Sequence, residues 1–212
     1  MKVFDYSEVR QYKFYHIAFK VVNLIAKVIF KIKYVGKENV PQEGGLIVAS
    51  NHICLLDPVF IGLGSGRTLH YMSKYENFEN PFLRLLYTHL NAFPVNRGHA
   101  DKSAVEYAIK IVEGEGALGI FPEGTRSKDL TPQKPKSGAA FVARVAKADI
   151  LPVSVYSETK IKMFSKITVR FGKPIPYEDL GFTENGGTAE IRAASRKIME
   201  EIQKLWEMRH CE

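Results

Sequence analysis

The chain has 212 residues and carries 30 lysines and arginines against 23 aspartates and glutamates, a formal net charge of +7. This length can bury a hydrophobic core without disulfides or metal, and it predicts one domain. The two cysteines, Cys54 and Cys211, exclude a disulfide-stapled scaffold and favour a reducing compartment. The charge favours an anionic partner, such as nucleic acid, a membrane surface, a phosphorylated substrate or an acidic protein, without choosing among them.

Residues 13–32 have the pattern of an amphipathic helix whose apolar face is unusually wide. Their polar residues recur every three or four positions and therefore fall on one narrow stripe of a helix. A helix crossing a bilayer would carry several lysines through about 30 Å of hydrocarbon, which is costly. A helix lying in the membrane interface suits the pattern best, with packing against the protein's own core as the alternative. The polar residues are Lys13, His16, Lys20, Asn23, Lys27 and Lys31.

Beyond residue 32, short apolar segments alternate with amphipathic segments, and turn-forming residues separate them. This alternation predicts a single α/β domain over residues 34–212, with a central, largely parallel or mixed sheet flanked by helices. The helix within residues 1–33 would precede this domain as an amphipathic membrane-association segment. Strands are expected at 32–36, 46–49, 69–72, 92–95, 117–121, 151–155 and 167–171, and helices at 57–63, 81–90, 101–112, 138–146 and 191–208.

His52 and Asp57 stand between an apolar strand and an Asp-Pro helix start. A neutral imidazole can accept a proton from a hydroxyl when a carboxylate fixes its other ring nitrogen. The two side chains can meet only if the chain turns between them, and a strand end followed by a helix start supplies that turn. The alternative is structural, because Asp57 before Pro58 has the pattern of a helix N-cap, and one side chain can serve both purposes.

Residues 121–127, Phe-Pro-Glu-Gly-Thr-Arg-Ser, follow a second buried strand, where the sites of α/β folds usually open. Gly124 lets the backbone approach a ligand, Thr125 can donate a hydrogen bond, and Arg126 can grip a phosphate with its guanidinium. Glu123 is a candidate to bind a ligand hydroxyl or to hold Arg126 in place. The alternative is a surface turn with a local ion pair.

Two further groups of cations are weaker indications of an anion site. Arg97 ends the short apolar segment 93–97, and Lys136 comes just before the helix expected at 138–146. An anion beside Lys136 would also gain the N-terminus of that helix. Residues 114–119 match a GxGxxG pattern, but they follow a helix and precede a strand, which is the reverse of a dinucleotide site.

Taken together, these stretches resemble the glycerolipid acyltransferase family, most closely the 1-acyl-sn-glycerol-3-phosphate acyltransferases. The resemblance covers roughly residues 35–175. Cys54 stands where the family often has serine, and Pro94 and Asn96 stand where it more often has isoleucine and aspartate. The four blocks that match are Asn51, His52 and Asp57, then Phe93 to Arg97, then Phe121 to Ser127, then Leu151-Pro152-Val153.

The resemblance implies a direct acyl transfer. His52 would deprotonate the free hydroxyl of the acceptor while Asp57 orients the ring, and the alkoxide would attack an acyl thioester. The donor would be acyl-CoA or acyl carrier protein, the acceptor the lysophospholipid 1-acylglycerol 3-phosphate, and the product phosphatidic acid. No cofactor and no metal are implied. The residues implied to hold the phosphate and the glycerol are Arg97, Glu123, Gly124, Thr125, Arg126 and Lys136.

The resemblance also implies a peripheral protein on the cytoplasmic face of the cell membrane. Its expected partners are an anionic membrane surface and, as a candidate, acyl carrier protein, but not nucleic acid. Alternative functions are acylation of another lysophospholipid or of glycerol 3-phosphate, and hydrolysis of a thioester with the same His/Asp pair. Further alternatives are catalysis with Cys54 as acyl nucleophile and a non-catalytic membrane adaptor.

On the favoured interpretation Asp57 both starts a helix and orients His52. Asp57→Asn should then reduce activity far more than stability, because asparagine also caps a helix and only the charge partner of the imidazole is lost.

Overall fold

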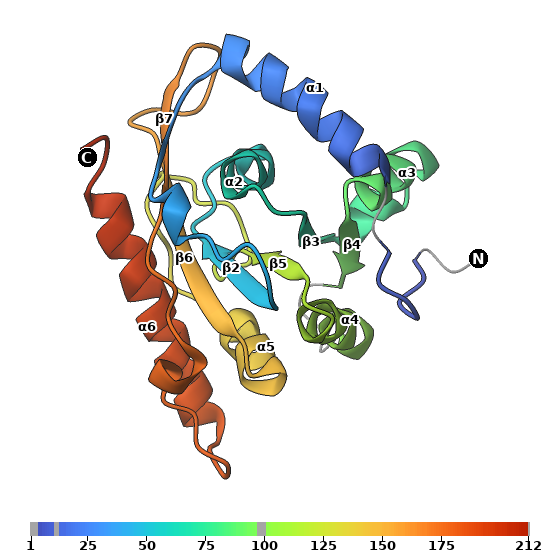
Figure 1. The fold of residues 1–212 in the computed structure, drawn as a ribbon, viewed down its shortest axis with the longest axis vertical. Helices are drawn as coiled ribbons and strands as arrows, with labels where there is room; N and C mark the ends of the chain where they lie inside the picture. Colours follow the sequence, from blue (N-terminus) through green and yellow to red (C-terminus); the bar gives the residue numbers. More distant parts are fainter. Residues whose placement is uncertain (1–3, 11–12, 97–100, 212) are drawn as a thin grey trace.

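The computed structural model describes residues 4–10, 13–96 and 101–211. Within this part of the chain, one seven-stranded sheet has helices on both faces (Figure 1). The strands are β1 (Lys31–Val35), β2 (Leu46–Ser50), β3 (Leu69–Lys74), β4 (Ala92–Val95), β5 (Ala117–Ile120), β6 (Asp149–Tyr156) and β7 (Lys166–Phe171). The helices are α1 (Lys13–Ile29), α2 (Asp57–Ser65), α3 (Pro81–His89), α4 (Lys102–Glu113), α5 (Gly138–Ala146) and α6 (Thr188–Glu207).

The helices form two layers around the sheet. α2 covers one face, with α1 packed against it, and α4, α5 and α6 cover the other face (Figure 1). The expected closing helix at 191–208 is α6, which begins earlier, at Thr188. α3 begins as expected, because the side chain of Asn80 accepts hydrogen bonds from the backbone N–H groups of Phe82 and Leu83 and so caps it.

The strand order is β1-β7-β6-β2-β5-β3-β4. The five strands from β6 to β4 in this order run parallel, whereas β7 pairs antiparallel with β6, and β1 pairs parallel with β7. The strands β2 to β6 therefore all finish at one end of the sheet, which we call the carboxyl end, and β1 and β7 begin there. The prediction of a single α/β domain with a mostly parallel, mixed sheet is confirmed.

The central strands are buried because helices cover both faces of the sheet. All residues of β2 and β5 are buried, and such continuous apolar runs are typical of parallel sheets between helix layers. Gly119 in β5 has a packing role, since a Cβ there would lie 2.1 Å from the ring of Tyr71. The hydroxyl of that tyrosine donates to the carbonyl of Pro58 at 3.0 Å. This contact ties the first turn of α2 to the sheet.

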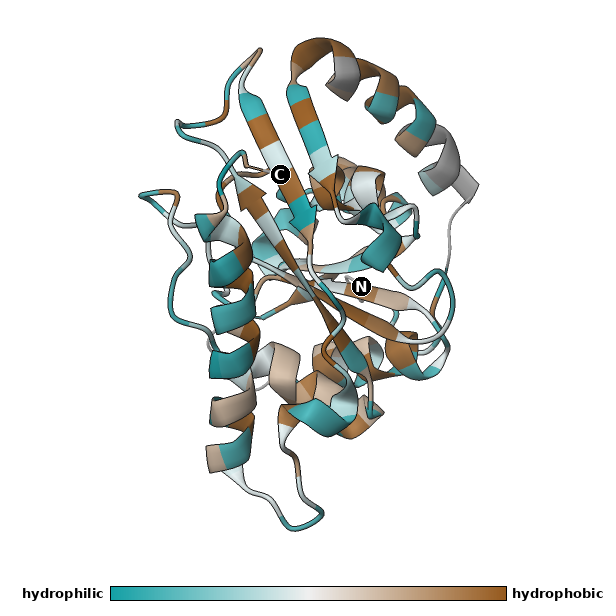
Figure 2. Cartoon of the chain, turned by 60° about the vertical axis from the view of Figure 1, so that its left-hand side comes forward, coloured by the Kyte–Doolittle hydropathy of each residue, from teal (hydrophilic) through white to brown (hydrophobic). Residues whose placement is uncertain are grey.

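α1 divides its apolar face between the protein and the solvent. Tyr15 and Ala26 are buried, and the ring of Phe19 packs on Gly62 of α2, where a Cβ would lie 2.4 Å from the ring. Other apolar side chains of α1 remain exposed, so its apolar face is wider than packing on the core requires. Figure 2 shows hydrophobic residues, in brown, along the described part of this helix. The exposed residues are Val21, Leu24, Ile25 and Val28.

The end of α1 differs from the expectation of a helix over residues 13–32. The helix stops at Ile29, because the chain enters β1 at Lys31 and pairs with β7. The expected boundary between residues 33 and 34 consequently falls inside β1. Among the described residues, no helix is both long enough and apolar enough to cross a membrane.

Candidate active site

His52 and Asp57 meet at the carboxyl end of the sheet. His52 follows β2, Asp57 is the first residue of α2, and the turn between them brings His52 Nδ1 within 2.7 Å of Asp57 Oδ2. The His52 side chain is 13% exposed and the Asp57 side chain 0%. Because a carboxylate accepts, the ring donates from Nδ1, and in the neutral ring Nε2 is then free to take a proton. The pair has the geometry of a general base held by its orienting group.

Asp57 does not cap α2, and this part of the expectation is wrong. The N-cap position belongs to Leu56, and no side chain caps it. The Asp57 carboxylate instead turns back toward the preceding loop, where its Oδ2 also accepts the backbone N–H groups of Ile53 at 2.7 Å and Cys54 at 2.8 Å. Three donors on one oxygen fix the carboxylate, and through it the imidazole, more firmly than a single His–Asp contact would.

Glu123 connects the loop after β5 to the loop after β2. Its Oε1 accepts the backbone N–H of His52 at 2.9 Å, and the backbone N–H of Ser127 donates to the His52 carbonyl at 2.7 Å. Its Oε2 is buried and has no hydrogen-bond partner among the described residues. Burial raises the pKa of the Glu123 carboxyl to about 7. Glu123 therefore holds the backbone of His52 with one oxygen, and its other oxygen has no partner among the described residues.

Gly124 and Lys136 form the second half of the candidate site. Gly124 has a φ of +70°, and a Cβ there would lie 3.0 Å from Cδ and 3.1 Å from Nζ of Lys136. The backbone N–H of Lys136 donates to the carbonyl of Pro122 at 2.8 Å, which fixes the two segments together. The left-handed backbone favours glycine here, and a larger side chain would also have to displace the end of the Lys136 side chain.

The remaining candidate residues are less constrained by contacts with the described part of the chain. Thr125 and Arg126 are exposed on the same loop as Glu123, where they are free to meet a ligand arriving from solvent. Arg97 lies outside the described residues. The structure therefore brings His52, Asp57 and Glu123 into direct contact, with Lys136 packed beside Gly124 in the same loop.

Two supporting residues escape prediction from sequence. The ring of Phe121 stacks on the imidazole of His52, with ring centroids 4.1 Å apart and an interplanar angle of 19°. The side-chain amide of Asn51 bonds both the N–H and the carbonyl of Val155 in β6, at 2.8 and 2.9 Å. Both residues belong to motifs that resemble the family, and this membership could have marked them as important. Their position at strand ends does not indicate which groups they contact.

Cys54 acts as a structural donor in this arrangement. Its thiol donates to Asp57 Oδ1 at 3.0 Å, and the backbone N–H of Leu56 donates to its sulfur at 3.3 Å. Burial, and after it the neighbouring Asp57 charge, raise the pKa of the Cys54 thiol above its usual range. Because the thiolate is the nucleophilic form, these surroundings are unsuited to nucleophilic catalysis. Among the described residues, no group of three or more His, Cys, Asp or Glu side chains is placed to hold a metal.

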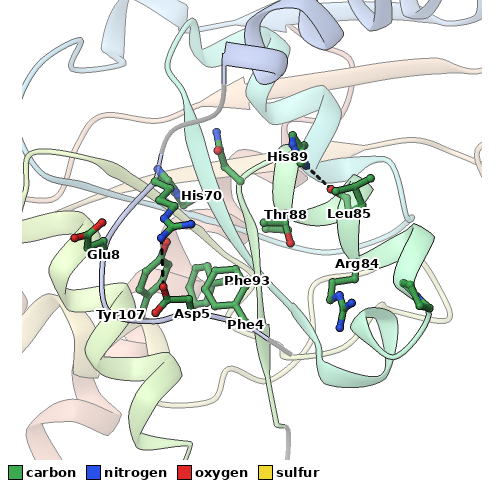
Figure 3. Close-up of a pocket in the computed structure, with 14 residues that line it drawn as sticks. Phe4, Asp5, Glu8, His70, Arg84, Leu85, Thr88, His89, Phe93 and Tyr107 are labelled. Atoms are coloured by element: carbon green, nitrogen blue, oxygen red, sulfur yellow. Dashed lines mark hydrogen bonds and ion pairs between the residues drawn. The ribbon is translucent and has the colours of Figure 1, made fainter. Parts of the chain in front are cut away.

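A cavity in the described part of the chain lies away from these residues. It has a volume of about 390 Å³ and opens between residues 4–10, α3 and the starts of β3 and β4. Figure 3 shows the rings of Phe4, Phe93 and Tyr107 together on one side, with Leu85 and Thr88 of α3 across from them. The candidate residues described above do not line it, since they stand at the carboxyl end of the sheet, whereas β3 and β4 begin at the opposite end.

Comparisons with known proteins find a matching family and similar chains. The sequence model of the family described as Acyltransferase matches residues 31–156. A 1-acyl-sn-glycerol-3-phosphate acyltransferase of Bacillus subtilis is 29% identical over 178 residues, which cover 82% of this chain and 87% of that protein. Another, of Streptococcus pneumoniae, is 28% identical over 192 residues, which cover 87% of this chain and 70% of that protein.

A solved structure shares the fold. The crystal structure of the 1-acyl-sn-glycerophosphate (LPA) acyltransferase from Thermotoga maritima superposes with a TM-score of 0.69 at 24% sequence identity. The match covers 89% of this chain and 78% of that chain.

Proposed function

The chain belongs to the acyltransferase family, and we propose that it transfers a fatty acyl group from a thioester to the free hydroxyl of 1-acylglycerol 3-phosphate. The product is phosphatidic acid, an intermediate of phospholipid biosynthesis. The names of the relatives support this choice of acceptor. The observation that carries the proposal is the 2.7 Å contact between His52 and Asp57, beside a buried carboxylate oxygen of Glu123 that has no hydrogen-bond partner among the described residues.

His52 begins the reaction as a general base. Its Nε2 takes the proton of the acceptor hydroxyl while the oxygen attacks the thioester carbonyl, and Asp57 stabilises the imidazolium that forms. The tetrahedral oxyanion then collapses, the carbon–sulfur bond breaks, and the imidazolium returns the proton to the departing thiolate. A general base of this kind contributes about 10² to 10⁴ in rate, and positioning of the two substrates supplies the rest.

The glycerol phosphate lies against the loop after β5. Glu123 lies on the glycerol side of this loop and holds it against His52 through the His52 N–H, while Lys136 and Arg126 approach the phosphate. Gly124 and Thr125 complete this side, and Arg97 is assigned to the phosphate by the family resemblance alone. No cofactor takes part, and the donor is acyl-CoA or acyl carrier protein.

The membrane is the second partner of this enzyme. Both the lipid acceptor and the lipid product partition into a bilayer, and the described part of α1 exposes Val21, Leu24, Ile25 and Val28 to solvent. The net charge of +7 attracts an anionic surface. We assign the protein to the cytoplasmic face of the cell membrane as a peripheral protein, with α1 lying in the interface.

An acceptor panel tests the proposed substrate. The purified protein is incubated with one acyl-CoA or acyl carrier protein donor and with 1-acylglycerol 3-phosphate, a lysophosphatidylcholine or glycerol 3-phosphate, and products are identified by mass. We expect phosphatidic acid to form at least tenfold faster than the other products. Faster acylation of either other acceptor would reassign the substrate within the same family.

Cys54→Ser tests the direct transfer. Serine can donate the same hydrogen bond to Asp57, so we expect the variant to keep at least about half of the wild-type kcat. Intact-protein mass spectrometry of the wild type with donor alone should show no added acyl group. An inactive Cys54→Ser variant, together with an acylated wild-type protein, would establish a cysteine nucleophile instead.

Glu123→Gln tests the burial of the Glu123 carboxyl. Because its pKa rises from 4.5 to about 7 on folding, the folded state binds a proton more tightly than the unfolded state between these pH values. The wild-type free energy of unfolding therefore falls as pH rises through this window and levels off above it. Glutamine keeps the acceptor for the His52 N–H and does not ionise, so the variant should gain about 2 kcal/mol relative to wild type between pH 4.5 and 8.

Urea unfolding of both proteins at pH 4.5, 6 and 8 measures this difference. Titrations shared by the two proteins cancel in the comparison. A stability difference that is the same at all three pH values would show that Glu123 is ordinarily solvated.

A further inference from the structure

A turn before β7 exposes two large apolar side chains. Met163 and Phe164 are each 63% exposed. Phe164 has a φ of +63°, a left-handed conformation that bulky residues rarely adopt. An exposed aromatic residue held in an unfavourable backbone conformation has no packing role that would explain it, which makes the turn a candidate contact surface.

The turn is fixed to the end of α1. The backbone N–H of Phe164 donates to the carbonyl of Ile29 at 2.7 Å, and the N–H of Lys31 donates to the carbonyl of Ser165 at 3.0 Å. Within the turn, the N–H of Lys162 donates to the hydroxyl of Ser165 at 2.9 Å. Met163 and Phe164 therefore form a rigid apolar tip, which we call the wedge, beside the last turn of α1.

Strand register places the wedge at the same end of the sheet as His52. Thr168 near the start of β7 pairs with Tyr156 at the end of β6, and Val153 of β6 pairs with Ser50 at the end of β2. His52 follows that end of β2. Figure 1 shows the segment before β7 beside the end of α1 that leads into β1. Leu55, in the loop between His52 and Asp57, is also exposed at this end.

Exposed lysines lie near the wedge in the sequence and in the strand paired with β7. Lys160, Lys162, Lys166 and Lys31 are exposed, and Glu158 is the one acidic residue between residues 157 and 166. Large apolar side chains with lysines close by in the chain match the two layers of a membrane interface, in which acyl chains lie inside and anionic head groups outside. An aqueous protein partner would be expected to cover such side chains with a shaped groove, whereas a lipid surface needs only apolar depth and charge.

We propose that the carboxyl end of the sheet docks on an anionic bilayer, with Met163 and Phe164 inserted among the acyl chains beside α1. The wedge and α1 then fix the orientation of the sheet, so that the loop carrying His52 faces the membrane and receives the acceptor hydroxyl without the lipid leaving the bilayer. This inference rests on the proposed function, because it assumes that the acceptor is a membrane lipid.

Phe164→Asn tests the wedge with little risk to the fold. Asparagine tolerates the left-handed conformation, so the melting temperature should be equal or higher, while the apolar side chain is lost. Co-sedimentation with vesicles of phosphatidylglycerol and phosphatidylcholine should show affinity reduced by about tenfold. The matched control is Val145→Gln, which removes an exposed apolar residue near the end of α5, at the opposite end of the sheet, and should bind as wild type.

A depth measurement provides an independent readout. The chain has one tryptophan, and the indole nitrogen of Trp206 has no hydrogen-bond partner among the described residues, so Trp206→Phe is a mild background. In this background Phe164→Trp should show blue-shifted emission on vesicle binding and quenching by lipids brominated on their acyl chains. Vesicle-bound protein in which the fluorescence of the introduced indole is neither shifted nor quenched would overturn the proposal.

Activity separates failure of the wedge from failure of the proposed function. With a short-chain acceptor below its micelle concentration, Phe164→Asn should turn over within about twofold of wild type, whereas acylation of a long-chain acceptor in vesicles should fall by about tenfold. Unchanged vesicle binding with weaker use of an acyl carrier protein donor would overturn the proposal in favour of a protein partner. A wild-type protein that acylates neither acceptor would refute the proposed function, and the vesicle arm would still decide the wedge.

Discussion

His52→Ala is expected to reduce kcat for acyl transfer by about 10² to 10⁴, the usual contribution of a general base. Removal of the imidazole leaves the acceptor hydroxyl with no group placed to take its proton, and Asp57, fully buried, cannot replace it. Binding of the acceptor should change much less than kcat, because the residues proposed to hold the phosphate lie on the loop after β5 and are unchanged. The measurement is steady-state kinetics with varied acceptor at saturating donor.

Two controls accompany His52→Ala. Circular dichroism and thermal unfolding show whether the fold survives the loss of the ring that stacks on Phe121. His89→Ala removes another histidine from α3, beside the cavity at the far end of the sheet, and should keep wild-type kcat. A His52→Ala protein that is folded and has more than a tenth of wild-type kcat would rule out His52 as the base.

Asp57→Asn is expected to reduce kcat by about 10² to 10³ while the protein remains folded. The backbone N–H groups of Ile53 and Cys54 both point at Oδ2, so they select the amide oxygen for that position and exclude the NH₂ group. The amide oxygen can still accept from His52 Nδ1, so the ring keeps its orientation and tautomer. The variant therefore removes the negative charge that stabilises the imidazolium and little else.

The same contacts set the effect on stability. The amide nitrogen of the introduced asparagine would face the Cys54 sulfur in place of Oδ1, which weakens one hydrogen bond in a buried site, so the free energy of unfolding should fall by about 1 to 2 kcal/mol. Asp57→Ala leaves the two backbone donors unpaired and should be less stable than Asp57→Asn. Equal stability of the two variants, or a kcat for Asp57→Asn within tenfold of wild type, would contradict this account.

Sequence reasoning reaches the His52–Asp57 contact because the two residues flank a strand end and a helix start. It does not reach the role of Asp57 within α2, since Asp-Pro has the same pattern whether the carboxylate caps the helix or turns back to the preceding loop. The role of the Cys54 thiol cannot be predicted from sequence for a similar reason. Its hydrogen bond to Asp57 depends on a loop conformation that tertiary contacts decide.

The layers of the fold follow from alternating segments, but two long-range features do not. Nothing in residues 166–171 indicates that β7 runs antiparallel to β6, or that residues 31–35 form the edge strand β1 beside it. The helix pattern of residues 13–32 overlaps the start of β1, because the apolar and charged residues there fit both the 3.6-residue period of a helix and the two-residue period of a strand. Pairing with β7 decides in favour of the strand. Tertiary contacts, not local sequence patterns, determine which distant strands pair.

The contact between Glu123 and His52 shows the same limit within the site. The sequence places Glu123 in a loop at a strand end and assigns it to a ligand hydroxyl or to Arg126. Its bond to the His52 N–H depends on β2 and β5 being neighbours in the sheet, a fact about strand order that residue patterns do not contain.

The most direct test of the central claim is the coupling of thioester consumption to acceptor acylation. Purified protein is mixed with an acyl thioester, with and without 1-acylglycerol 3-phosphate, and thiol release, phosphatidic acid and free fatty acid are measured together. We predict one phosphatidic acid for each thiol released, and negligible thiol release without the acceptor. Thiol release at the same rate without acceptor, with free fatty acid as the product, would show that His52 and Asp57 activate water and that the protein is a thioesterase.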